Sequence, residues 1–215
     1  SAGSIINGVS KVTGKEPVAP SSFAFLKNDD RPKVWTMIVD LGKCTGCGAC
    51  TRACQAGHFV PFKQEWIHIY ELEDAFNKKF FFPRLCMNCQ KAPCVRVCPV
   101  GANFYDEQRN VLINQDVCIG CRMCMAACPY DARSFNWTEP EHTPEELNHE
   151  YSPHEPWPHR KGVVEKCDWC TNHASMGMLP FCVSACPTGV LYFGNFREDA
   201  VTNGLGESLS ITEIF

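Results

Sequence analysis

Sixteen cysteines are the residues of this 215-residue sequence whose type and spacing can do chemistry. They form four groups of four, and no cysteine lies outside these groups. The residues between successive cysteines number two, two and three in the first and third groups, two, four and three in the second, and two, eleven and three in the fourth. The groups are Cys44, Cys47, Cys50 and Cys54; Cys86, Cys89, Cys94 and Cys98; Cys118, Cys121, Cys124 and Cys128; and Cys167, Cys170, Cys182 and Cys186. Thiolates at such spacing indicate either bound metal or, if oxidised, disulfides.

Three chemistries compete for this pattern. Disulfides suit small secreted chains, but neighbouring C-x-x-C pairs would need unfavourable local bridges, and 215 residues can bury a core without them. Zinc usually pairs two C-x-x-C units per ion, which leaves the third cysteine of each short run unexplained. An iron–sulfur cluster takes three thiolates from one tight loop and a fourth from elsewhere, as in the C-x-x-C-x-x-C-x-x-x-C-P run of two-cluster ferredoxins. The spacing therefore favours iron–sulfur clusters.

The residues around the cysteines agree with this interpretation. Proline follows the last cysteine of groups two, three and four, as Pro99, Pro129 and Pro187, where it fixes φ and removes a donor as the chain leaves the site. Gly120 lies inside a ligand loop, where a missing Cβ lets backbone amides approach sulfur. Group one departs from the pattern because Gln55 follows its last cysteine, so its exit is expected to differ.

Short strands are expected directly before three of the groups, and short helices within them. The β-prone runs are residues 34–40, 111–114 and 162–165, and the segment 123–128 has the character of a short helix. The alternation Trp66-Ile67-His68-Ile69-Tyr70 predicts a further strand, in which His68 is structural. Each unit is thus a strand, a ligand loop and a short helix, and the fold class is α+β.

Composition excludes several classes of protein. Hydrophobic residues make up 45% of the chain and charged residues 20%, which excludes a disordered chain. The longest apolar runs, such as residues 35–41, are far shorter than the roughly 20 residues of a spanning helix, so we expect no span in this chain. A formal charge of −4 gives no general attraction to nucleic acid.

Neither a catalytic motif nor a leader is visible. No nucleophile–base pair, P-loop or G-x-G-x-x-G is found, so a non-catalytic chain is expected. The chain begins at Ser1 without a charged-then-apolar leader, and we expect that any targeting peptide has been removed or was never present.

The motifs resemble the four-cluster iron–sulfur subunits of the dimethyl sulfoxide reductase superfamily over about residues 34–193. Dimethyl sulfoxide, polysulfide, tetrathionate and formate-dependent nitrite reductase complexes have such subunits. The resemblance rests on residues 94–102, 118–130, 134–137 and 162–167. The last two stretches are most similar to the periplasmic subunits of alternative complex III and of the sulfate-reducer transmembrane redox complex.

The resemblance implies which cysteines share a cluster. Groups one and four exchange their last cysteines, and so do groups two and three. We name the resulting ligand sets as follows: set one, Cys44, Cys47, Cys50 and Cys186; set two, Cys86, Cys89, Cys94 and Cys128; set three, Cys118, Cys121, Cys124 and Cys98; set four, Cys167, Cys170, Cys182 and Cys54. Some relatives lack one cysteine, but all sixteen are present here, so four [4Fe–4S] clusters are expected.

It also implies an organisation into two modules that resemble bacterial two-cluster ferredoxins. One comprises residues 34–62 and 160–193 and the other residues 80–136, with an N-terminal arm at 1–33, an insertion loop at 137–159 and a C-terminal tail at 194–215. The arm, the loop and the tail are expected to contact partners. Four histidines of the insertion loop are irregularly spaced, which favours a solvated or docked loop over a metal site or a proton relay: His142, His149, His154 and His159.

The implied function is electron transfer within a respiratory oxidoreductase complex. The expected partners are a multi-span membrane subunit linked to quinone or haem, and a molybdopterin or multihaem subunit. The expected place is the extracytoplasmic, periplasmic side of the membrane, with attachment through another subunit. The alternatives are a stand-alone soluble electron carrier and a zinc-stabilised interaction module. The terminal substrate and the direction of electron flow are not determined by the sequence.

Overall fold

Short strands and short helices are interspersed along the chain, as expected for an α+β protein. The computed structural model describes residues 32–61, 63–149 and 158–214. The three strands predicted before cysteine groups are present as β1 (Trp35–Val39), β5 (Val111–Ile113) and β7 (Val164–Glu165). Most of the expected N-terminal arm, residues 1–31, lies outside the described residues.

A four-stranded antiparallel sheet joins the two ends of the described chain. Its order is β1, β8 (Leu191–Asn195), β9 (Ala200–Thr202) and β10 (Ser208–Ser210). The central pairing sets Met37 opposite Phe193, and β9 and β10 pair beyond β8. The described part of the expected C-terminal tail therefore belongs to a sheet. It folds because Val201 and Ile211 bury their side chains against Tyr192 and form a small core of their own.

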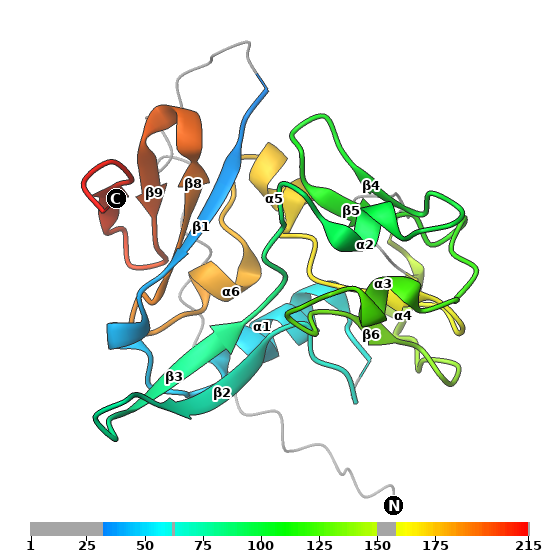
Figure 1. Cartoon of the computed structure of the whole chain (residues 1–215), viewed down its shortest axis with the longest axis horizontal. Coiled ribbons are helices and arrows are strands. Elements are labelled where there is room, and N and C mark those ends of the chain that lie inside the picture. Colours follow the sequence, from blue (N-terminus) through cyan, green and yellow to red (C-terminus); the bar gives the residue numbers. More distant parts are fainter. Residues whose placement is uncertain (1–31, 62, 150–157, 215) are drawn as a thin grey trace, which may run out of the picture.

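Three antiparallel pairs of strands complete the described strands, and they lie in different parts of the molecule. β2 (His68–Glu73) pairs with β3 (Lys79–Arg84), β4 (Asn103–Tyr105) with β5, and β6 (Ser134–Phe135) with β7. The predicted strand at residues 66–70 is thus present, although it begins two residues later and runs further. Figure 1 shows β1, β8, β9 and the β2–β3 hairpin on one side of the molecule and β4, β5 and β6 on the other.

The helices are short, and most begin inside or beside a cysteine group. They are α1 (Ala49–His58), α2 (Pro93–Arg96), α3 (Met123–Ala126), α4 (Pro144–Leu147), α5 (Thr171–Ser175) and α6 (Phe181–Ser184), with single 3₁₀ turns η2 (Leu41–Lys43) and η3 (Phe196–Glu198). α1 packs on α6, and α2 packs on α3. Within the described ranges, no helix has the length and apolar character needed to span a membrane.

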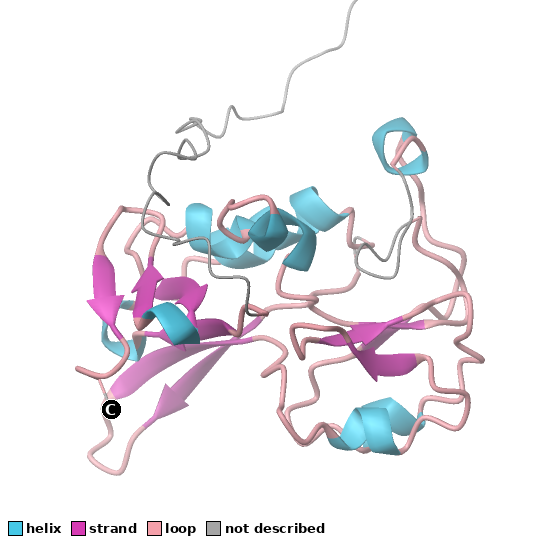
Figure 2. Ribbon diagram, turned by 90° about the horizontal axis from the view of Figure 1, so that it is seen from above, coloured by secondary structure: helices cyan, strands magenta, loops and turns pink. Residues whose placement is uncertain are grey.

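The cysteines belong to the cores of the two sides. The larger core contains buried cysteines of groups one and four together with Trp35, Ile67 and Phe193. The smaller core contains Cys94 and Cys124 with Val111 and Ile113. Figure 2 shows strands gathered in two places, with much of the chain between them in loops. Thiols therefore occupy places that larger apolar side chains fill in other small domains.

The described part of the insertion loop is more closely packed than expected. α4 begins after Thr143, whose side chain accepts a hydrogen bond from the amide of Glu146. Glu146 and His159 are fully buried, with exposed fractions of 1% and 0%. The expectation of a solvated or partner-docked loop is thus wrong for His159, which is buried within this chain and whose hydrogen bonds to Glu146 and Glu165 offset its burial. His154 lies outside the described residues.

Candidate metal centres

Set one brings together both ends of the described chain. Cys44, Cys47 and Cys50 line a small apolar cavity with Cys186, which follows α6. The amide of Val190 donates a hydrogen bond to Sγ of Cys186 at 3.3 Å. Its other lining residues are mostly apolar and include Ile69, Pro83, Pro187, Val190 and Leu191. Four convergent sulfurs in a mostly apolar cavity, with the Thr188 hydroxyl 3.8 Å from Sγ of Cys186, form a suitable site for a soft metal cluster.

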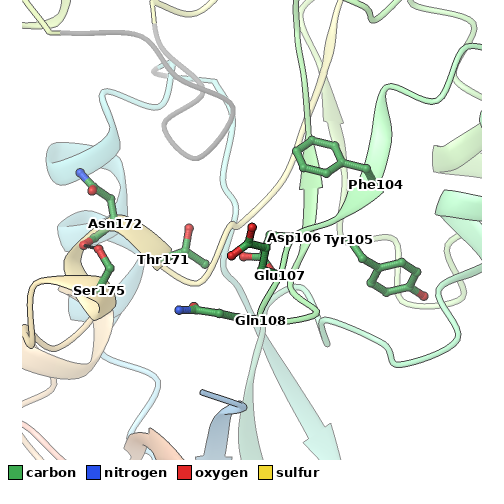
Figure 3. A pocket seen from close by; sticks show the side chains of 8 residues that line it. All are labelled: Phe104, Tyr105, Asp106, Glu107, Gln108, Thr171, Asn172 and Ser175. Atoms are coloured by element: carbon green, nitrogen blue, oxygen red, sulfur yellow. Dashed lines mark hydrogen bonds between the residues drawn. The ribbon is translucent and has the colours of Figure 1, made fainter. Parts of the chain in front are cut away.

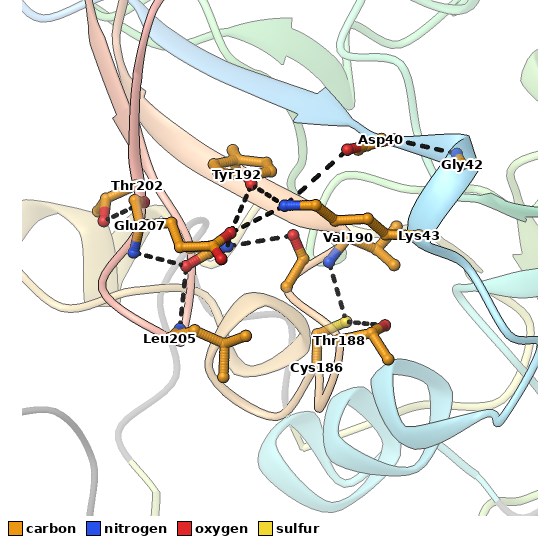
Figure 4. Close-up of polar contacts among 12 residues, drawn as sticks. Asp40, Gly42, Lys43, Cys186, Thr188, Val190, Tyr192, Thr202, Leu205 and Glu207 are labelled. Carbon is orange, nitrogen blue, oxygen red and sulfur yellow. Dashed lines mark hydrogen bonds and ion pairs between the residues drawn. The ribbon is translucent and has the colours of Figure 1, made fainter.

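An ion pair beside set one ties the ligand loop to the C-terminal strands. Nζ of Lys43, next to Cys44, donates hydrogen bonds to Tyr192 at 2.7 Å and to Glu207 at 2.8 Å (Figure 4). Hydrogen bonds from Lys43 and Tyr192 lower the pKa of the Glu207 carboxyl to about 2. The segment after β9 therefore contributes to the position of a ligand loop, which the sequence did not indicate.

Set two forms a similar cavity on the other side of the molecule. Cys86, Cys89 and Cys94 line it with Cys128, which follows α3. The hydroxyl of Tyr105 donates to the carbonyl oxygen of Gln90 at 3.0 Å and accepts from the amide of Ala92 at 2.6 Å. This side chain fixes the turn between Cys89 and Cys94, where the spacing is longer than in group one.

Set three lies beside set two. Cys118, Cys121 and Cys124 line a cavity with Cys98, which follows α2. Burial alone would raise the pKa of Cys98, but amides of Asn103 and Val100 donate to its sulfur, and the net effect lowers that pKa. Gly120 has a φ of +67°, and a Cβ at this position would collide with the carbonyl oxygen of Gly162. The ligand loop thus needs glycine at this point for both conformation and space.

Set four is the most deeply buried of the sets. Cys54, Cys167, Cys170 and Cys182 are all buried. Burial and, after it, the charge of Asp168 raise the pKa of Cys167 to about 12. Burial raises the pKa of Cys54 well above its ordinary value, and its neighbours Cys167 and Cys182 raise it further. Four thiols this close and this dry cannot all ionise without a compensating cation, so the site is suited to bound metal.

Two buried histidines stand beside set four. Nε2 of His58 lies 3.1 Å from Sγ of Cys170 and 3.8 Å from Oδ1 of Asp168. His159 holds the backbone of His58 in place, because its Nε2 donates to the His58 carbonyl oxygen at 2.7 Å. Its Nδ1 lies 2.7 Å from Oε1 of Glu165. Both ring nitrogens thus face oxygen atoms that can accept, an arrangement that favours the doubly protonated, positively charged imidazole.

The pKa values of these two histidines are shifted in opposite directions. Burial lowers the pKa of His58. Burial would also lower that of His159, but the hydrogen bond and charge of Glu165 outweigh it and the pKa is raised. Neither His58 nor Asp168 is a candidate on sequence grounds. The available signal is the departure of group one from the Cys-Pro exit, which places His58 four residues after Cys54.

The four sets follow one another in space in the order one, four, two, three. Cys50 of set one is close enough to Cys182 and Cys54 of set four for its charge to raise their pKa values further, after burial. Cys86 of set two acts on Cys167 in the same way, after burial and Asp168. Sets two and three share a core through Cys94 and Cys124.

The most exposed cysteines lie at the two ends of this series. All sixteen cysteines lie within the described residues, and the two classed as exposed are Cys47 of set one and Cys121 of set three. The other cysteines are buried or partly buried. The two ends of the series are therefore the most accessible, and set four, which follows set one, is the driest.

A separate polar cavity lies between the two sides of the molecule. It has a volume of about 490 Å³ and is lined by residues 104–108 of the β4–β5 hairpin and by Thr171, Asn172 and Ser175 of α5. Figure 3 shows Asp106, Glu107 and Gln108 facing α5 across it. No cysteine lines this cavity, so it is distinct from the four sets.

Comparison with known proteins agrees with this geometry. Two models of a 4Fe-4S dicluster domain match the chain, one over residues 77–143 and 152–196 and the other over residues 43–102. A putative dimethyl sulfoxide reductase iron-sulfur subunit of Halobacterium salinarum is 36% identical over 182 residues, covering 77% of this chain and 68% of the relative. This chain belongs to the iron–sulfur subunits of the dimethyl sulfoxide reductase superfamily.

Two other relatives show a similar identity to this chain. A selenate reductase subunit of Mesobacillus selenatarsenatis is 38% identical, with 76% of this chain and 61% of the relative covered. The iron-sulfur cluster-binding subunit of menaquinone reductase of Nitratidesulfovibrio vulgaris is 37% identical, with 76% of each chain covered. The chain thus spans about two thirds of the length of the Halobacterium and Mesobacillus relatives. Membership confirms the resemblance seen in the sequence and the kind of cofactor, a 4Fe–4S cluster.

Proposed function

We propose that this chain holds four [4Fe–4S] clusters, one on each of sets one to four, and conducts electrons in single steps between two redox partners. When bound, such clusters supply one-electron redox chemistry. The chain itself performs no substrate chemistry: its residues fix the positions of the clusters, exclude water and set the potentials. The observation that carries the proposal is the spatial order one, four, two, three, with exposed cysteines only at its two ends.

Apolar side chains at both ends support docking of partner proteins there. At set three, Ile119 lines the cavity and is 63% exposed, and Trp137 is 65% exposed while its ring packs 4.4 Å from the guanidinium of Arg122. At set one, Ile69 and Pro83 of the β2–β3 hairpin line the cavity, and Phe76 beyond them is 90% exposed. Exposed apolar groups gathered at a functional site are typical of interaction surfaces.

The relatives suggest the kinds of partner. One is a multi-span membrane subunit that exchanges electrons with quinone or haem, since one relative is a menaquinone reductase subunit. The other is a molybdopterin-type catalytic subunit or a multihaem chain, since other relatives are subunits of dimethyl sulfoxide and selenate reductases. We further propose a peripheral, extracytoplasmic position on the periplasmic side of a respiratory membrane, with attachment through the membrane subunit.

Metal analysis tests the cofactor content. We expect about sixteen irons and about sixteen acid-labile sulfides per chain, because each of four cubes holds four of each. The protein should be brown, with a broad visible absorption that bleaches on reduction. Eight irons in a fully loaded preparation would contradict the four-cluster proposal. A colourless protein with stoichiometric zinc would favour the zinc-stabilised module.

A second experiment distinguishes a subunit that conducts electrons within a complex from a stand-alone soluble carrier. The tagged chain would be isolated from native membranes in mild detergent, with Ile119→Glu and Phe76→Glu variants beside the parent and Phe196→Glu as a control at an exposed site. We expect full iron content in all four proteins and the loss of a different co-purifying redox subunit in each of the first two variants. Purification of the parent as a lone monomer would favour the soluble carrier.

A further inference from the structure

The ring of His58 is directed at one ligand sulfur of set four. Its Nε2 lies 3.1 Å from Sγ of Cys170, within hydrogen-bonding distance for a sulfur acceptor. Both residues are buried, and the two positions are 112 residues apart in the sequence. For comparison, Cys186 of set one and Cys128 of set two accept from the backbone amides of Val190 and Ala132, and Cys186 also lies 3.8 Å from the hydroxyl of Thr188.

Chemistry fixes the direction of this hydrogen bond once iron is bound. A thiolate that ligates iron carries no proton, so it can only accept. The proton between the two atoms must therefore be on the imidazole nitrogen. His58 does not ligate iron in this arrangement, because Cys54 already completes the four cysteines of set four.

The surroundings hold the imidazole in this orientation. Its ring packs 5.1 Å from the ring of Trp66 and edge-on at 5.3 Å from Phe181, measured between centroids. His159 fixes the backbone by donating to the carbonyl oxygen of His58 at 2.7 Å. On the sulfur side, Oδ1 of Asp168 accepts the amide of Cys170 at 2.9 Å, which fixes the ligand. Both partners of the hydrogen bond are thus held from opposite sides.

We propose that His58 is a tuning residue: its Nε2–H donates to the Cys170 ligand sulfur and raises the reduction potential of the set-four cluster. The inference rests on the proposed function, since it requires a cluster on set four. Reduction adds one electron to the cluster and makes its sulfurs better acceptors, so a fixed donor stabilises the reduced state more than the oxidised state. Low local polarity strengthens the effect, because set four is buried.

The test is a redox titration of the loaded, full-length protein monitored by EPR. Three variants are compared with the parent: His58→Leu, which removes the donor; His58→Gln, which keeps an N–H at a similar reach; and His68→Leu, a half-exposed histidine on β2. The signal of the set-four cluster is assigned by its loss in Cys182→Ser. In His58→Leu we expect about a tenfold lower ratio of reduced to oxidised set-four cluster at a fixed potential, which is about 59 mV for one electron.

The controls separate tuning from a structural effect. In His58→Gln the reduction potential of the set-four cluster should return most of the way to the parent value, and in His68→Leu it should not change. All three variants should keep the iron content of the parent. A second readout is the nitrogen coupling seen by pulsed EPR in protein labelled with ¹⁵N-histidine, which should be lost in both His58 variants and kept in His68→Leu.

The outcomes distinguish the two proposals. Full iron content with an unchanged set-four potential in His58→Leu overturns the inference and leaves the four-cluster function intact. Loss of the set-four signal in both His58 variants shows that the ring supports the site and does not tune it, and this also overturns the inference. A parent protein that cannot be loaded with iron overturns the proposed function instead.

Discussion

The indole nitrogen of Trp169 donates a hydrogen bond of 2.7 Å to the carbonyl oxygen of Cys86. Trp169 lies between Cys167 and Cys170 of set four, whereas Cys86 is the first cysteine of set two. One side chain thus joins two ligand loops from opposite sides of the molecule. The residue adopts a φ of +63°, which is uncommon for a bulky side chain, so the neighbouring structure must hold it there.

Replacement of Trp169 by Phe should weaken this junction and leave the clusters in place. The variant keeps an aromatic ring for the contact with Phe193 but loses the indole N–H, at an expected cost of about 1 kcal/mol in the free energy of unfolding. We expect a lower temperature for loss of the visible absorbance and altered EPR signals from sets two and four. Trp35→Phe is the matched control, since its lost bond goes to Gln108, away from any cysteine. Equal changes in the EPR spectra of both variants would contradict a specific role of the Trp169–Cys86 hydrogen bond in joining sets two and four.

The crossed ligand sets predict an unusual result for Cys54→Ser. Cys54 follows Cys50 in the chain, yet its sulfur lies with Cys167 and Cys182. We expect damage to the set-four cluster, with about four irons at risk, and a nearly normal EPR signal from set one. Cys50→Ser should give the reverse. Loss of the set-one signal alone in Cys54→Ser would show that the groups do not exchange their last cysteines.

Local patterns of the sequence predicted the parts of the fold that depend on local interactions. The β-prone runs before Cys44, Cys118 and Cys167 became β1, β5 and β7, and the segment after Arg122 became α3. Cysteine spacing, because it is a stereochemical requirement of the cluster, indicated the groups without any knowledge of the fold.

The features that the sequence did not predict depend on distant partners. β9 and β10 are three residues each, too short for a periodicity signal, and they form because Val201 and Ile211 meet Tyr192. His58 gains its contact with Cys170 only when that residue, 112 positions away in the sequence, is folded beside it. The buried charge of His159 likewise depends on Glu165 and on the carbonyl of His58.

Gly120→Ala should be far more damaging than Gly101→Ala, although both glycines have a φ of +67°. A Cβ at residue 101 meets nothing within 4 Å, so we expect only the conformational cost of about 1–2 kcal/mol. At residue 120 the new carbon would collide with the backbone of Gly162, adding about 1–3 kcal/mol and displacing the set-three loop. Iron content and the temperature of bleaching report both effects. Equal behaviour of the two variants would exclude the steric explanation.

The buried charge of His159 predicts a pH dependence of stability. Its pKa is raised in the folded protein, so the folded state holds this proton more tightly than the unfolded state does. The resulting stabilisation is complete below the unfolded pKa of about 6.5 and is lost as the pH rises through the folded value. His159→Gln should therefore lower the bleaching temperature most in mildly acidic buffer, and the difference from the parent should narrow toward alkaline pH. Parallel curves would contradict a charged His159, and His68→Gln serves as the exposed control.

The sheet that pairs β1 with β8 has a consequence for the order in which the protein is made. On the proposed ligand sets, sets two and three are complete once residue 128 has left the ribosome, whereas sets four and one wait for Cys182 and Cys186. A nascent chain can thus receive the clusters of sets two and three first, while set one still has only three of its four ligands, Cys44, Cys47 and Cys50. Cluster insertion into set one must then wait until Cys186 has been synthesised, so the first of the sixteen ligands to emerge belong to a centre that is the last to receive all its cysteines.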